Sequence, residues 1–110
     1  MEKSVAALHP TSDDVVRDDA RPYFLWWTDL TVAELRRQLQ HEDRAVRSYW
    51  MGALLREANT RDVWQFVRPE EIRALWTELQ RHLGRARARW AFLLDLPNDW
   101  PPRAGSTGQR

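Results

Sequence analysis

The sequence contains no cysteine, which excludes disulfide bonds, thiol catalysis and thiolate zinc sites. It also lacks a strong charge of either sign, because 17 basic residues nearly balance 16 acidic ones and leave a formal net charge of +1. A dedicated non-specific nucleic-acid binder usually carries a large basic excess. No apolar run approaches the ~18 residues of a membrane-spanning helix, and the N-terminus shows no signal-peptide core. We therefore expect a cytoplasmic protein.

Glycine is scarce as well, and its four residues form none of the motifs that mark nucleotide-binding loops or a nucleophilic serine. The triplet His41-Glu42-Asp43 lacks the second histidine of the H-E-x-x-H zinc motif, because Ala45 stands at that position. This triplet is better interpreted as a loop and helix cap. No acid, base and nucleophile can be combined into a catalytic group. We predict a protein that is not an enzyme and binds no metal or cofactor.

The 110 residues, 43% hydrophobic and 30% charged, are typical of one small globular domain. Residues 1–20 hold five acidic residues against two basic ones, and residues 1–22 are predicted to form a disordered acidic lead. Residues 97–110 are rich in proline and glycine and are predicted to form a disordered tail. The helical domain is therefore expected over residues 23–96.

The first two helices carry clear sequence signals. Thr31 and Glu34 have the spacing of a capping box, which predicts a helix over about 32–40. Residues 44–58 are apolar around most of a helical circumference, which is typical of a central, buried helix. The pattern leaves a narrow polar arc made by Ser48, Gly52, Arg56 and Asn59.

The second half of the domain is also predicted to be helical. A short helix follows Asn59, and another begins at Pro69 and ends before Gly84. The last element, about 86–96, alternates arginine with apolar residues as a strand does, but its composition and longer spacing favour a helix. We expect an all-α fold, a compact bundle of four or five short helices.

Aromatic residues are abundant, with seven tryptophans in the chain. Trp50, Trp76 and Trp90 are expected in the core, where large side chains bury much area. A domain this small has little interior for the rest, and Trp and Tyr are enriched at binding hot spots. We therefore predict that part of the run 23–27 contacts a partner protein. The candidate residues in this run are Tyr23, Trp26 and Trp27.

The one concentrated charge of the sequence lies near its end, where Arg85, Arg87 and Arg89 follow Arg81. These arginines suit a solvated helical rim, and they also suit contact with phosphates or an acidic protein surface. A third interpretation is that the acidic lead of the same chain folds over them. We include Arg85, Arg87 and Arg89 among the candidate partner-binding residues.

Several stretches carry a resemblance to a known family: YFLWW at 23–27, LTVAEL at 30–35, LLREA at 54–58, DVW at 62–64, EEI at 70–72 and RWAFLL at 89–94. Over about residues 23–96 the chain resembles small helical proteins that are encoded beside AbiE-type nucleotidyltransferase toxins and regarded as their antitoxins. The resemblance implies an all-α protein that neutralises a nucleotidyltransferase, with direct binding as the expected route. It assigns no role to any individual residue.

Other interpretations remain open at this stage. Residues 35–47 look like one helix pair of a HEAT-type repeat, although a stable solenoid needs about three such units. A generic helical interaction module would use similar physics. The arginines near the end of the chain also allow a nucleic-acid-binding regulator, whose affinity would fall steeply with salt.

Overall fold

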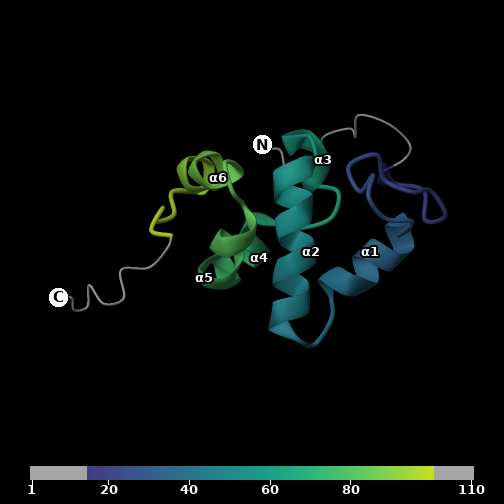
Figure 1. Ribbon diagram of the computed structural model, residues 1–110, viewed down its shortest axis with the longest axis horizontal. Helices are drawn as coiled ribbons and strands as arrows, with labels where there is room; N and C mark the ends of the chain where they lie inside the picture. The colour runs from purple at the N-terminus through teal and green to yellow at the C-terminus, as the bar shows by residue number, and fades with distance from the viewer. Residues whose placement is uncertain (1–14, 101–110) are drawn as a thin grey trace, which may run out of the picture.

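The computed structural model describes residues 15–100, and within this range every regular element is a helix (Figure 1). This confirms the predicted all-α fold. Helix α2 (Arg44–Glu57) stands in the middle, with α1 (Val32–Leu39) on one side and α4, α5 and α6 on the other. The disorder predicted for residues 1–14 and 101–110 lies outside the described residues.

Helix α1 begins at the predicted capping box. The Thr31 backbone N–H donates to Oε1 of Glu34 over 2.8 Å, and the Glu34 N–H donates to Oγ1 of Thr31 over 3.2 Å. These reciprocal bonds satisfy two donors that a helix start otherwise leaves without partners. The helix buries Leu35 and Leu39 against the core, and it packs along α2.

Helix α2 is the central helix that its apolar pattern predicts. Asp43 caps its start, because Oδ1 of Asp43 accepts from the Ala45 N–H over 2.8 Å. Its buried side chains include Met51, Leu54 and Leu55. Helices α1, α3, α5, α6 and the 3-10 helix η3 (Gln80–His82) all contact α2, so most of the domain is built around it.

Only half of the narrow polar arc predicted for this helix is exposed. Arg56 and Asn59 face solvent, but Ser48 is 1% exposed and Gly52 is buried. The Ser48 hydroxyl donates to the Arg44 carbonyl of its own helix over 2.8 Å, so it needs no partner outside the helix. A Cβ on Gly52 would lie 2.4 Å from the Cβ of His82. The absence of a side chain at Gly52 therefore lets η3 approach α2 closely.

His82 is partly buried at this contact. Desolvation by burial lowers the pKa of its imidazole below the ordinary value of 6.5, and the neighbouring charges of Arg81 and Arg56 add to the effect. The neutral imidazole is accordingly favoured where η3 meets α2.

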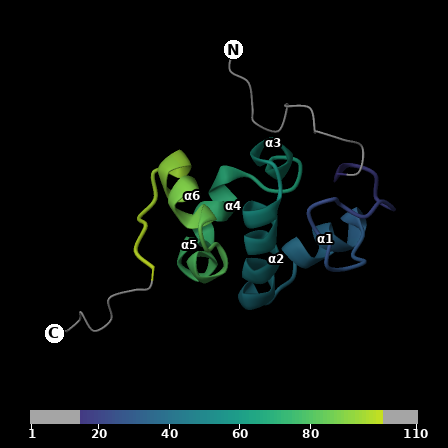
Figure 2. The ribbon, with the colours of Figure 1, turned by 45° about the horizontal axis from the view of Figure 1, so that its top comes forward.

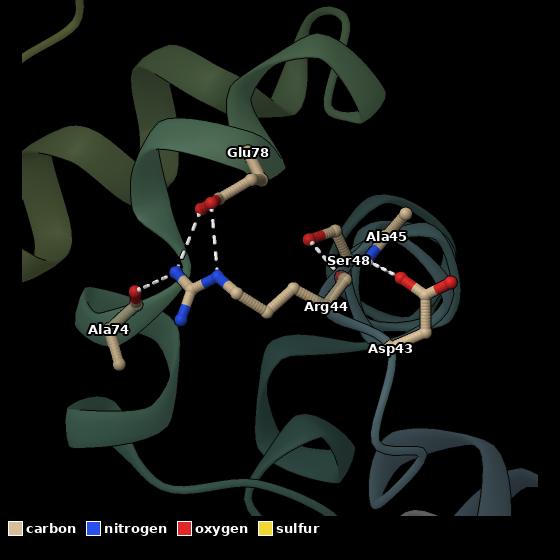
Figure 3. Close-up of polar contacts among 6 residues, drawn as sticks. All are labelled: Asp43, Arg44, Ala45, Ser48, Ala74 and Glu78. Carbon is tan, nitrogen blue, oxygen red and sulfur yellow. Dashed lines mark hydrogen bonds and ion pairs between the residues drawn. The ribbon is translucent and has the colours of Figure 1, made fainter.

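The helix expected from Pro69 to Leu83 is divided into three. Helix α4 (Pro69–Ala74) ends at Leu75, whose φ of −106° and ψ of 8° leave the α-helical region, and α5 (Trp76–Leu79) and η3 follow. Figure 3 shows how Arg44 bridges this break: its guanidinium donates to the Ala74 carbonyl over 2.9 Å and to both Glu78 carboxylate oxygens over 3.0 and 3.1 Å. The bonds from Arg44 lower the pKa of the Glu78 carboxyl.

The last element, α6 (Ala86–Leu94), is a helix rather than a strand, as its composition predicts. Trp90 is fully buried on its inner face, and the indole N–H donates to the Leu55 carbonyl of α2 over 2.9 Å. The helix ends at Asp95, which adopts the left-handed conformation with φ of 57°. Helix α3 (Thr60–Val63) lies beyond the C-terminal end of α2 (Figure 1).

The packed domain extends beyond the predicted 23–96 at both ends. Val15 is fully buried in the core, and the Val32 N–H donates to the Ala20 carbonyl over 2.9 Å. At the other end, the Trp76 indole donates to the Pro97 carbonyl over 2.7 Å. Composition missed these segments because a few buried or hydrogen-bonded residues order a stretch that is polar on average.

The contact at Gly52 generates a stability prediction. Helix propensity alone predicts that Gly52→Ala stabilises α2, by up to about 1 kcal/mol. We expect instead a loss of about 1–3 kcal/mol, because the added methyl overpacks the contact with His82. Urea unfolding followed by tryptophan fluorescence measures the free energy of unfolding.

Gly84→Ala serves as the control. A Cβ at Gly84 meets nothing within 4 Å, so only its left-handed backbone, with φ of 51°, opposes the change. Its cost should stay near 1 kcal/mol. A Gly52→Ala protein as stable as the wild type would contradict the close packing of η3 on α2.

Candidate protein-binding surface

The segment 23–27 follows two turns rather than a helix or a strand. The Leu25 N–H donates to the Pro22 carbonyl and the Thr28 N–H donates to the Leu25 carbonyl, each over 3.1 Å. Neighbouring side chains consequently leave the segment in different directions. Phe24 and Leu25 enter the core, whereas Trp26 is 76% exposed.

Tyr23 anchors this segment to α3. Its hydroxyl donates to Oδ2 of Asp62 over 2.6 Å and accepts from the Asn59 backbone N–H over 2.9 Å. Asp62 is fully buried, so its carboxylate depends on partners supplied by the protein. Tyr23 is 42% exposed, but the contacts of its hydroxyl give it a structural role within the predicted partner-binding run.

Trp27 connects the exposed ring of Trp26 to the core. Trp27 is half-buried and packs against the core, and the Arg56 guanidinium lies 5.9 Å from its ring centroid. The two indole rings meet edge to face, with centroids 5.4 Å apart and an interplanar angle of 81°. A depression of about 320 Å³ lies beside Trp26 and is flanked by the ion pair of Arg21 and Asp29. Trp26 is therefore an exposed aromatic ring that contacts a second tryptophan, and this second tryptophan packs against the core.

The three arginines predicted to bind a partner differ in their contacts. Arg87 donates from Nε to Oδ1 of Asn98 over 3.0 Å, and Arg89 donates from Nη2 to the Leu55 carbonyl over 3.3 Å. Both side chains thus help to hold α6 and the segment after it in place. Arg85, at the N-cap of α6, is exposed.

The structure does not combine the aromatic and arginine candidates into one site. The segment 23–27 lies with α1 and α3, whereas α6 lies on the opposite side of α2 in both views (Figures 1 and 2). The described part of the acidic lead also packs on the α1 side, since the Ala33 N–H donates to the Asp18 carbonyl over 3.1 Å. Its residues 15–20 therefore do not cover the arginines of α6.

The triplet 41–43 forms a turn before α2. Nδ1 of His41 accepts from the Asp43 N–H over 3.0 Å, while the Asp43 carboxylate caps the helix. Among residues 15–100, no group of three or more histidine, aspartate or glutamate side chains is placed to hold a metal ion. Over the same residues, no helix has the length and apolar character to cross a membrane.

Sequence reasoning missed the most exposed aromatic ring of the described chain. Phe92 is 86% exposed on α6, and Leu93 beside it is 48% exposed. The signal was present, because Arg85, Arg89 and Phe92 are spaced four and three residues apart and so share one helical face. The apolar stretch around Trp90 concealed it, since hydropathy alone does not separate the two faces of this helix.

Comparisons of the chain with protein-family models, with curated proteins and with solved structures find no match. Support for a function therefore comes from the residues and geometry described above and from the resemblance in sequence. Of these, the supported and exposed Trp26 is the feature most typical of a binding surface.

The hydroxyl of Tyr23 gives a direct test of the anchor. Tyr23→Phe removes the bond to the buried Asp62 carboxylate and the bond from the Asn59 N–H. We expect a loss of about 1–3 kcal/mol in the free energy of unfolding, measured in urea. The matched control is Tyr49→Phe in α2, whose ring is partly exposed and contacts Trp50 and His82 edge to face. Equal stability of the two variants would contradict the anchoring role.

Proposed function

We propose that the chain is a non-enzymatic, antitoxin-like protein that restrains a nucleotidyltransferase by binding it directly. The observation that carries this proposal is Trp26, which is 76% exposed although the segment around it is anchored to the core. When a partner covers a large aromatic ring that was exposed to water, the free energy falls, which favours binding. Tryptophan is also the residue type most enriched at binding hot spots.

The rigidity of the segment supports a binding role. Tyr23 holds one side of it through Asp62, and Trp27 holds the other through the core. A side chain that is already positioned loses little conformational freedom when it binds, so more of the contact energy appears as affinity. The depression beside Trp26 adds a concave surface at the same place.

The class of partner comes from the sequence resemblance. The stretches that resemble AbiE-type antitoxins include the run 23–27, in which Trp26 lies, and also the capping-box segment 30–35 that follows it. Such a protein acts on a nucleotidyltransferase and needs no catalytic residues of its own. The exposed ring and the resemblance therefore favour the same kind of function.

The nucleic-acid interpretation has less support. Arg87 donates to two acceptors within the chain, Oδ1 of Asn98 and the Gln80 carbonyl, which reduces the donors that it offers to phosphate. The formal net charge of +1 also provides little general attraction to a polyanion.

Affinity capture followed by a binding measurement tests the proposal. The tagged full-length chain is used to capture proteins from its native host, and the captured material is assayed for transfer of radiolabelled nucleotides. Calorimetry with the purified enzyme then compares the wild type with Trp26→Ala. We expect Trp26→Ala to weaken binding by at least about tenfold, which corresponds to ~1.4 kcal/mol. Circular dichroism should show the same helical content in both proteins.

Phe92→Ala is the matched control, because it also removes an exposed aromatic ring but belongs to α6, which lies on the other side of α2 from the segment 23–27. It should bind the enzyme as the wild type does. The proposal is wrong if no nucleotidyltransferase activity is captured, or if Trp26→Ala binds with unchanged affinity.

A further inference from the structure

The outer face of α6 combines an apolar doublet with positive charge. Phe92 and Leu93 are exposed near its C-terminal end, and Arg85 and Arg89 lie on the same side one and two turns earlier. Ala88, also exposed, lies at the edge of this face beside Arg85.

Both arginines of this face retain hydrogen-bonding capacity. Arg89 has five N–H donors, of which one is recorded in a bond to the Leu55 carbonyl over 3.3 Å. No hydrogen bond or ion pair to another residue of the described range 15–100 is recorded for the Arg85 side chain. The acidic residue closest in sequence is Asp95 at the end of the helix, beyond Phe92. The arginine end of the face is therefore positively charged.

We propose that this face docks an acidic amphipathic helix of a partner protein. The partner helix carries two acidic side chains one turn apart, which meet Arg85 and Arg89. An apolar pair one further turn away then packs on Phe92 and Leu93. The match is geometric as well as electrostatic, because both helices repeat every 5.4 Å. Arginine and carboxylate form bidentate, charge-assisted bonds, which set the register of the two helices.

A protein helix fits this face better than a nucleic acid does. Leu93 beside Phe92 extends the apolar surface beyond the single ring on which a base would stack. The segment 23–27, which holds Trp26, lies on the other side of α2 from α6 (Figure 2). This inference therefore does not depend on the proposed function.

A designed peptide provides the probe. It is a fluorescein-labelled, 18-residue helix with two glutamates one turn apart and two leucines one turn further, and a second peptide has lysine in place of both glutamates. Fluorescence anisotropy measures their binding to the full-length chain at low and at high salt. We expect the glutamate peptide to bind, with affinity that falls as salt rises, and the lysine peptide to bind at least about tenfold more weakly.

Variants of the chain test whether the glutamate peptide binds to the outer face of α6. Phe92→Ala and Arg85→Glu should each weaken the glutamate peptide by about tenfold or more, and circular dichroism should confirm that both stay folded. Trp26→Ala and Arg37→Glu, which change an exposed tryptophan and an exposed arginine elsewhere, should leave binding unchanged. Retained binding of Trp26→Ala separates this result from the nucleotidyltransferase interface.

Three results would overturn the proposal. The first is absence of binding by the glutamate peptide at low salt, and the second is equal binding by the lysine peptide. The third is tighter binding of a single-stranded oligonucleotide that is lost in Phe92→Ala, because the face would then be a nucleic-acid surface.

Discussion

The close contact between α2 and η3 at Gly52 is the constraint that brings the second half of the domain against the central helix. The missing side chain brings η3 against α2, where the His82 carbonyl accepts from Nη1 of Arg56 over 2.8 Å. The same Arg56 guanidinium lies by the Trp27 ring, which in turn supports Trp26. One turn away, the Leu55 carbonyl accepts from Trp90 and so holds the inner face of α6. The missing side chain at Gly52 thus admits η3, and the neighbouring Leu55 and Arg56 contact α6 and the aromatic segment.

The fold was largely predictable, because its helices begin at local signals such as the Thr31–Glu34 capping box and Pro69. The face of α2 that packs on η3 was not, since hydropathy counts Ser48 and Gly52 as polar when their small size is what matters. For the candidate site, the sequence indicated which segment to consider but not which of its side chains are exposed. An apolar run gives no sign that its turns bury Phe24 and expose Trp26, and a run of arginines does not show which of them bond within the chain.

The two surfaces differ in chemistry as well as in position. The Trp26 surface has a single exposed aromatic ring that contacts Trp27, with an ion pair and a depression beside it. The α6 surface is a helical face with a basic end and an apolar end. The segment 23–27 that holds the first surface and the helix α6 that holds the second lie on opposite sides of α2 (Figure 1).

The most direct test of restraint, as distinct from binding, is a titration of nucleotidyl transfer. The captured nucleotidyltransferase is held at a fixed concentration well above the dissociation constant, and its rate is followed as the purified chain is added. Direct inhibition predicts a linear fall in rate that ends at a simple stoichiometric ratio, and a shallower curve that extends to higher ratios with Trp26→Ala. A rate that stays constant beyond saturation of binding would contradict the proposed restraint.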